Sequence, residues 1–123
     1  MKKLLTTLLV SGLLALGAVS AQAADTAPKS VIHVVTVSFK KEATPEQIQA
    51  AIDGVKKLPS QYKGITRTWT RVIKNQTDRT HIFVMEFADE KALADYANSD
   101  AQKEWYKVYT SIRERSATSD ITN

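Results

Sequence analysis

Residues 79–96, RTHIFVMEFADEKALADY, contain the change of pattern that decides the fold. Over the first half of this stretch, side chains alternate between two faces, as they do in a β-strand. One face would carry His81, Phe83, Met85 and Phe87, and the other would carry Ile82, Val84, Glu86 and Ala88. After Asp89, a candidate N-cap, the apolar spacing becomes helical up to about Ala97. The stretch therefore predicts a strand followed directly by a helix.

An earlier stretch, VIHVVTVSF within residues 30–40, has the same character as the strand at 79–87. Its alternation places His33, Val35, Val37 and Phe39 on one face, and Ile32, Val34, Thr36 and Ser38 on the other. Both faces are apolar or small, which is typical of a strand that is covered on both sides. We therefore expect both of these strands to be central in one sheet.

Residues 44–47, TPEQ, predict the start of a helix, with Thr44 as N-cap and Pro45 in the first position. Helical spacing then continues through four apolar residues, Ile48, Ala51, Ile52 and Val55. This helix is expected to end near Leu58–Pro59. Gly54 costs about 1 kcal/mol relative to alanine inside a helix, so we expect it to permit close packing on the sheet.

Three further segments complete the pattern. Residues 65–74 are rich in threonine and arginine and predict an edge strand. One face of that strand would carry Ile65, Arg67, Trp69, Arg71 and Ile73. Residues 101–115 predict a helix with one stripe formed by Trp105, Val108, Tyr109 and Ile112, and residues 116–123 predict a short final strand. The order β-α-β-β-α-β predicts a ferredoxin-like α+β sandwich with the first and third strands as central neighbours.

In such a sandwich the helices cover only one face of the sheet. The other face, with Ile32, Val34, Ile82 and Val84, would be left as an exposed apolar patch. A second copy of the chain could cover this patch, so we predict a homodimer that packs sheet against sheet and closes into a dimeric α/β barrel.

The N-terminal segment, residues 1–23, has the pattern of a signal peptide. Two lysines precede an apolar run, and Ala21, Gln22 and Ala23 match a cleavage site, so residues 24–123 would form one exported domain, periplasmic or secreted. The alternative, a retained anchor, is less consistent with the pattern because the run is shorter than the roughly 20 residues that span a bilayer. We therefore expect no membrane span after cleavage.

Composition excludes several classes of protein. The net charge of +4 includes Lys2 and Lys3, no run of like charges is present, and no nucleic-acid-binding motif is found, so nucleic acid is not an expected partner. The chain has no cysteine, so an exported domain would depend on its core and on self-association for stability. It also lacks the GxSxG, P-loop and GxGxxG motifs.

The segments IHVVTVSFK, TPEQIQAAIDGVKKLP, THIFVMEFADEKALADY and AQKEWYKVY together resemble the stress-responsive α/β-barrel (Dabb) domain over roughly residues 31–121. This resemblance implies a ferredoxin-like fold and a homodimer, but most members have no assigned reaction. In one branch, a plant polyketide cyclase, a tyrosine and a histidine act as an acid/base pair. The resemblance places Tyr96 at the tyrosine and Gln102 at the histidine. Glutamine cannot shuttle a proton near neutral pH, which counts against the cyclase mechanism.

The resemblance also places His33 and His81 at pocket-lining positions, and the imidazoles would lie side by side if the two strands are neighbours. They could act as acid and base, bind an anionic group or be structural histidines. A metal site is not favoured because no third ligand lies at a suitable spacing, and we expect no cofactor. The apolar residues expected to line a ligand pocket, or simply to fill the core, are Val35, Val37, Phe83, Met85, Trp105 and Tyr109, with Gln102 beside them.

Two functions remain open at this point. The favoured one is a dimer that binds a small hydrophobic or aromatic molecule without turnover. The alternative is a cofactor-free acid/base enzyme, such as a cyclase, isomerase or monooxygenase, that uses His33, His81 and Tyr96.

Overall fold

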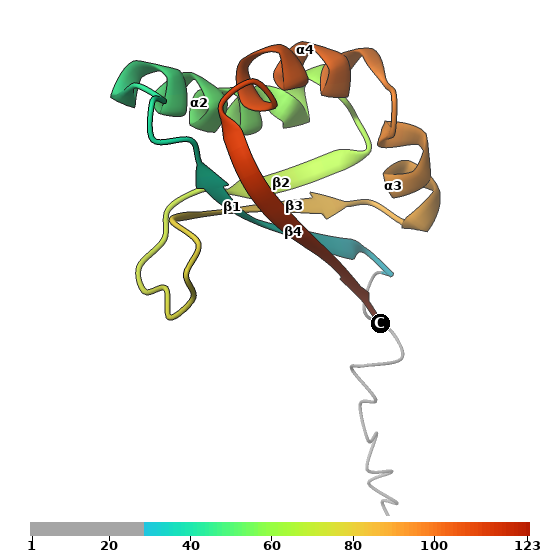
Figure 1. The fold of residues 1–123 in the computed structure, drawn as a ribbon. Helices are drawn as coiled ribbons and strands as arrows, with labels where there is room; N and C mark the ends of the chain where they lie inside the picture. The colour runs from blue at the N-terminus through green and yellow to red at the C-terminus, as the bar shows by residue number, and fades with distance from the viewer. Residues whose placement is uncertain (1–28) are drawn as a thin grey trace, which may run out of the picture.

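The structure is a computed structural model that describes residues 29–123. The predicted signal peptide, residues 1–23, lies outside the described residues. Figure 1 shows the elements, which are β1 (Val31–Phe39), α2 (Pro45–Gln61), β2 (Ile65–Trp69), β3 (His81–Phe87), α3 (Glu90–Tyr96), α4 (Asp100–Tyr109) and β4 (Arg113–Thr122). Within residues 29–123 we find no helix whose length and apolar character would allow it to cross a membrane.

The four strands form one antiparallel sheet in the order β2-β3-β1-β4. The predicted central position of β1 and β3 and the predicted edge position of β2 are therefore confirmed. In Figure 1 the helices α2 and α4 lie on one side of this sheet, and α3 lies at one end of it. The fold is ferredoxin-like α+β, as the order of elements predicts.

The predicted start of α2 is confirmed by a capping box. Thr44 Oγ1 accepts a hydrogen bond from the Gln47 N–H at 3.2 Å, and Gln47 Oε1 accepts one from the Thr44 N–H at 2.9 Å. The predicted end near Leu58–Pro59 is wrong, because the helix continues through Pro59 to Gln61. Beyond the proline, the N–H of Tyr62 donates to the Leu58 carbonyl at 2.9 Å, so the last turn still closes.

The C-terminal part departs most from the sequence prediction. Helix α4 ends at Tyr109 and not near 115, and β4 begins at Arg113. The apolar spacing that reaches Ile112 was misleading because Ile112 is buried in the turn between α4 and β4. The backbone of β4 is held by its pairing with β1, which runs from Arg113 opposite Phe39 to Thr122 opposite Val31.

Strand β2 is shorter than predicted and ends at Trp69. Its pairing with β3 is irregular between Ile65 and Arg67, where the register shifts. Ile65 therefore lies buried on the helix side, whereas Arg67 pairs with Glu86 and Trp69 pairs with Val84 on the open side. The prediction that Ile65 shares a face with Arg67 and Trp69 is wrong for this reason.

The core lies between the sheet and the helices. Phe83, Met85 and Phe87 of β3 are fully buried there. Gly54 of α2 packs against Trp105 of α4, and not on the sheet as expected. The indole Nε1–H of Trp105 donates to the Ala51 carbonyl at 3.0 Å, so this hydrogen bond joins the two helices inside the core.

No helix of residues 29–123 covers the opposite face of the sheet (Figure 1). This face carries the predicted apolar side chains. We call this the open face; its apolar members are Ile32, Val34, Trp69, Ile82, Val84 and Ile121. Trp69 is 44% exposed and Ile121 is 61% exposed. Glu86 lies within this face and accepts two hydrogen bonds from the Arg67 guanidinium, at 2.9 and 3.0 Å.

Candidate functional site

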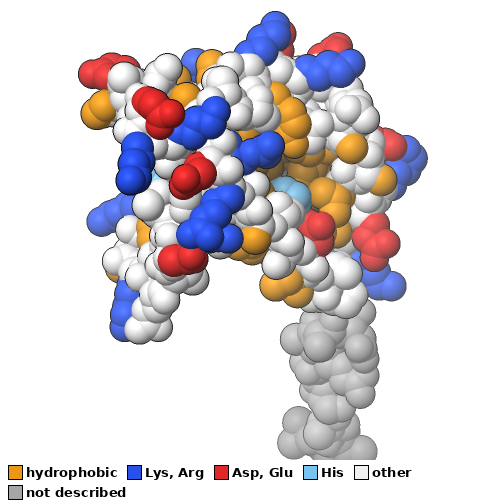
Figure 2. All heavy atoms as spheres, in the orientation of Figure 1, with side chains coloured by type: hydrophobic (Ala, Val, Ile, Leu, Met, Phe, Trp, Pro, Cys, Tyr) orange, Lys and Arg blue, Asp and Glu red, His pale blue; other side chains and the backbone are white. Residues whose placement is uncertain are grey.

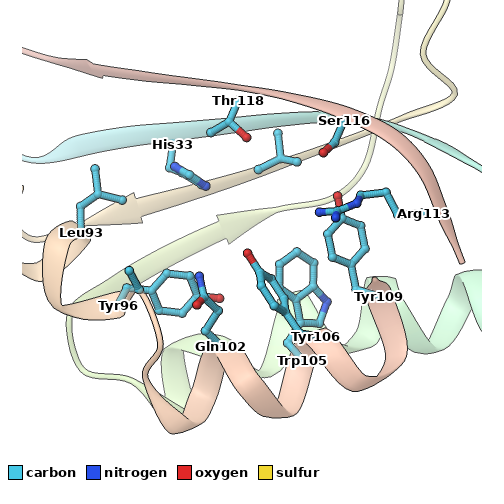
Figure 3. A pocket seen from close by; sticks show the side chains of 12 residues that line it. His33, Leu93, Tyr96, Gln102, Trp105, Tyr106, Tyr109, Arg113, Ser116 and Thr118 are labelled. Atoms are coloured by element: carbon cyan, nitrogen blue, oxygen red, sulfur yellow. The ribbon is translucent and has the colours of Figure 1, made fainter. Parts of the chain in front are cut away.

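A cavity of about 300 Å³ lies between β1 and β4 on one side and α3 and α4 on the other. Figure 2 shows it as a hollow in which a histidine is surrounded by hydrophobic side chains, and Figure 3 shows its lining. Six of the predicted site residues line it, namely His33, Val35, Tyr96, Gln102, Trp105 and Tyr109. Sequence reasoning missed the other six, which are Leu93, Ala97, Tyr106, Arg113, Ser116 and Thr118.

Four predicted site residues do not line this cavity. Val37, Phe83 and Met85 are fully buried and contribute to the core instead. His81 lies opposite Val37, whereas His33 lies opposite Met85, so the two histidines are four positions apart along β1. At about 3.3 Å per residue they are separated by roughly 13 Å. The expected side-by-side pair is wrong, because antiparallel pairing places the first residue of β3 opposite the later part of β1.

His33 instead pairs with a carboxylate that the sequence did not single out. Its Nδ1 lies 2.5 Å from Asp120 Oδ1, and Asp120 is also its backbone partner on β4. A carboxylate can only accept, so the His33 ring donates from Nδ1 in this contact, and Nε2 takes no part in it. The ring of Phe87 packs edge-on against the imidazole, with the two ring centres 5.7 Å apart. The pair therefore holds a histidine in one orientation at the wall of the cavity.

His81 has a different environment at the other end of the sheet. Its ring packs against the ring of Phe39, with the two ring centres 4.9 Å apart, and its Nδ1 lies 2.9 Å from Thr80 Oγ1. Burial lowers the pKa of His81, which favours the neutral ring. Its surroundings are those of a packed histidine, and it is not among the residues that line the cavity with His33 and Tyr96.

Two tyrosine hydroxyls in the cavity wall, those of Tyr96 and Tyr109, are buried and have no hydrogen-bond partner in the described part of the chain. Burial raises the pKa of both. Ser116 and Arg113 lie near the Tyr109 hydroxyl and partly offset the rise of its pKa. Neither side chain meets the geometry of a hydrogen bond to that hydroxyl. A buried hydroxyl without a partner costs about 1–3 kcal/mol. Each would gain from a polar group on a bound molecule once the side chain turns its hydroxyl into the cavity, because both oxygens are closed off from solvent in this structure.

Gln102 holds the turn between α3 and α4. Its Oε1 accepts a hydrogen bond from the Asn98 N–H at 2.7 Å, where Asn98 has a left-handed φ of 63°. Its backbone N–H in turn bonds to Ser99 Oγ at 3.2 Å. The glutamine therefore positions the helix that carries Trp105, and its remaining amide hydrogens are the donors it can offer to the cavity.

Residues 29–123 contain no group of three or more histidine, cysteine or acidic side chains placed to hold a metal ion. The side chains that line this site supply one oriented imidazole, three tyrosines, an arginine and an aromatic wall in which the rings of Trp105 and Tyr109 are stacked with their centres 4.3 Å apart.

Solved structures with a similar fold include enzymes and proteins without assigned function. A hydroxynitrile lyase from Passiflora edulis matches with a TM-score of 0.70 and 16% identity, covering 79% of this chain and 95% of that protein. A dimeric ferredoxin-like protein of unknown function from Bacteroides fragilis matches with a TM-score of 0.60 and 16% identity, and the match covers 76% of this chain and 96% of that protein. SnoaB, a cofactor-independent oxygenase from Streptomyces nogalater, matches with a TM-score of 0.62 and 10% identity, and the match covers 77% of this chain and 93% of that protein. At these identities the likeness shows the fold alone.

A comparison with curated proteins found no significant match. The family model described as the stress responsive A/B barrel domain, Dabb, matches residues 31–123 and thus covers the whole sheet and all three helices. The chain therefore belongs to the stress-responsive α/β-barrel (Dabb) domain family.

Proposed function

We propose that this protein is an exported homodimer that binds a small hydrophobic or aromatic molecule in the cavity between the sheet and the helices. The observation that carries the proposal is the lining of that cavity. Trp105, Tyr106 and Tyr109 offer aromatic surface, and the hydroxyls of Tyr96 and Tyr109 lack partners in residues 29–123. Ligand pockets typically combine apolar walls with a few convergent polar groups.

The size of the cavity supports a small ligand. Its volume of about 300 Å³ lies at the lower end of the range for small-molecule pockets, which is about 300–1,000 Å³. A molecule with one or two rings would fill it. Because the aromatic side chains come from α4, any change in the position of that helix would change the affinity.

The open face supports the homodimer. Its central valines, Val34 and Val84, pair with each other across β1 and β3, and Trp69 extends the apolar surface to the edge. A second sheet packed on this face would remove it from water. The dimeric protein from Bacteroides fragilis provides an example of a similar fold that assembles in this stoichiometry.

The dimer is tested by Val84→Glu, which places a charge in the middle of the open face. Burying an unpaired charge costs several kcal/mol, so the variant should be monomeric at concentrations where the unchanged protein is dimeric. Val108→Glu on α4 is the matched control, because Val108 is 38% exposed on the helical side, and it should remain dimeric. Light scattering after gel filtration gives the mass, and circular dichroism checks folding. A folded Val84→Glu dimer would contradict the proposed interface.

The ligand and the export are tested together by native mass spectrometry. The full-length chain is expressed in a bacterium, and the protein is purified gently from the periplasmic fraction. Two subunits starting at Ala24, with an additional mass of a few hundred daltons, are the expected result. Retention of residues 1–23, or absence from the periplasm, would contradict export. An empty dimer that also binds no member of an aromatic compound library in calorimetry would contradict the binding function.

A cofactor-free acid/base enzyme is the second candidate, and the pairing of His33 with Asp120 favours it. Asp120 holds Nδ1 of the imidazole and leaves Nε2 out of this pair, in a ring that lines the same cavity as Tyr96. The retained molecule should be incubated in excess with the protein and followed by chromatography and mass spectrometry. If the protein is an enzyme, each subunit should convert many molecules of this compound. His33→Gln should then lose this turnover and still form the dimer. A binding protein returns the compound unchanged.

A further inference from the structure

We propose that the molecule bound in this cavity carries a carboxylate or a similar monoanionic group, and that Arg113 and Ser116 at one end of the cavity select it. This inference rests on the proposed binding function and adds the chemical class of the ligand. It also assigns the orientation of the ligand, with its acid toward Arg113 and its apolar body between the helix aromatics and His33.

Arg113 is a half-buried cation without a carboxylate of its own. Arg67, Arg79 and Arg115 each form an ion pair with a carboxylate. In the part of the chain that the structure describes, no such pair is found for Arg113, whose guanidinium instead lies 5.4 Å from the centre of the Tyr109 ring. Figure 3 shows its side chain reaching from β4 across that ring towards the cavity. Removing a guanidinium partly from water is costly, and an anion on a bound molecule would offset this cost.

Hydroxyl groups stand beside this cation on the same strand. Ser116 lies opposite Val37 and Thr118 lies opposite Val35, so both point to the helix side of the sheet together with the other lining residues. Ser116 and Arg113 both act on the side chain of Tyr109, at the same end of the cavity. A guanidinium with an adjacent hydroxyl matches the two oxygens of a carboxylate, because both groups supply donors to it.

The charges of the cavity are arranged along its length, and this fixes the orientation. Asp120, at the His33 end, lies four positions along β4 from Ser116, or roughly 13 Å. Among the residues that line the cavity, Arg113 is the one permanently charged side chain, and Asp120 stands beside His33 at the other end. An anion would be repelled at the Asp120 end and attracted at the Arg113 end. The aromatic body of the ligand is then left against Trp105 and Tyr106, which lie between the two ends.

The test uses pairs of compounds that differ in charge but not in shape. Isothermal titration calorimetry at neutral pH compares 2-naphthoate with 2-naphthamide, and 4-hydroxybenzoate with 4-hydroxybenzamide. For the unchanged protein, the acid of at least one pair should bind about 10- to 100-fold more tightly than its amide, since a charge-assisted hydrogen bond contributes at this level. Arg113→Gln should lower the affinity for the acid far more than the affinity for the amide, and thereby abolish this preference, because the amide carbonyl loses only a neutral acceptor's hydrogen bond. Arg113→Lys should keep part of it.

Arg115→Gln is the matched control, since Arg115 is the next arginine on β4 and pairs with Asp78 outside the cavity. It should keep the full preference for the acid. Equal binding of acid and amide by the unchanged protein would overturn the inference while leaving the binding function intact. A preference that survives in Arg113→Gln would overturn the role of Arg113. Absence of binding for all four compounds would count against the binding function itself, and the inference would fall with it.

Discussion

Replacement of Gly54 by alanine is expected to destabilise this protein, although the same change in most helices is stabilising by about 1 kcal/mol. Gly54 has no positive φ, so its backbone does not require glycine. A Cβ atom at this position would lie 2.5 Å from Trp105 Cδ1 and 3.2 Å from Trp105 Nε1. The sign of the effect therefore depends on whether the indole can move away.

The surroundings of Trp105 oppose such a movement. Ordinary contact begins at 3.4 Å, so the ring would have to retreat by about 0.9 Å from a Cβ at 2.5 Å. The indole is held by its hydrogen bond to the Ala51 carbonyl at 3.0 Å and by the stacked ring of Tyr109. Overpacking costs about 1–3 kcal/mol, and a weakened hydrogen bond adds up to about 1 kcal/mol. After subtraction of the helical gain, we expect a net loss of about 2 kcal/mol.

Urea unfolding followed by circular dichroism measures this loss, with Lys56→Gly and Lys56→Ala as matched controls. Lys56 lies exposed on the same helix, so at that position alanine should be more stable than glycine by about 1 kcal/mol. At position 54 the order should be reversed. If Gly54→Ala is as stable as the unchanged protein, or more stable, then the close packing of α2 on Trp105 does not limit this helix, and the reasoning is refuted.

Two further predictions concern acid stability and the tyrosines. Hydrogen bonds from Arg67 and, to a smaller extent, from Thr66 lower the pKa of Glu86 from 4.5 to about 2. The stability that this carboxylate contributes to the folded protein is therefore complete above pH 4.5 and is lost as the pH falls towards 2. The free energy of unfolding should therefore decrease over this interval more steeply than in Glu86→Gln; parallel curves would contradict the prediction. Tyr96→Phe removes a buried hydroxyl without a partner, so it should leave stability unchanged or raise it by up to about 1 kcal/mol while weakening ligand binding. Tyr62→Phe removes a hydroxyl that donates to the Ala92 carbonyl at 2.6 Å and should cost about 1 kcal/mol; equal effects of the two changes in urea unfolding would be inconsistent with this difference.

The parts of the fold that the sequence predicted correctly depend on short-range chemistry. Thr44 and Asp89 are N-caps as predicted, because their side chains bond to N–H groups only three residues away. The alternation at His81–Phe87 is visible because one face of β3 is buried and the other is not. Trp105 was placed at the cavity because helical spacing shows which side of a helix faces the sheet, whereas Tyr96 was placed there by the family resemblance.

The errors arose where the pattern was weak or the contact was distant. β4 reads RERSATSDIT and lacks apolar alternation, so its start at Arg113 was missed, and with it the place of Arg113 in the cavity wall. Ser116, Thr118 and Asp120 stand at every second position of the predicted strand, which was the signal that could have placed them on one face. The bulge in β2 was also invisible, because a register shift depends on the partner strand and not on the sequence of β2 alone.

The sequence by itself determined the order of elements, the ferredoxin-like fold, the uncovered apolar face of the sheet and the membership in the Dabb family. The order of elements, the fold and the uncovered face follow from periodicity and capping, which are encoded within a few neighbouring residues. The family membership follows instead from the resemblance of whole segments to the Dabb domain. Only the tertiary structure decided which side chains meet. It separated His33 from His81 and joined His33 to Asp120, 87 positions later. Strand register is a property of two distant segments, and a shift by one residue moves every side chain to the other face, so no single segment can specify it.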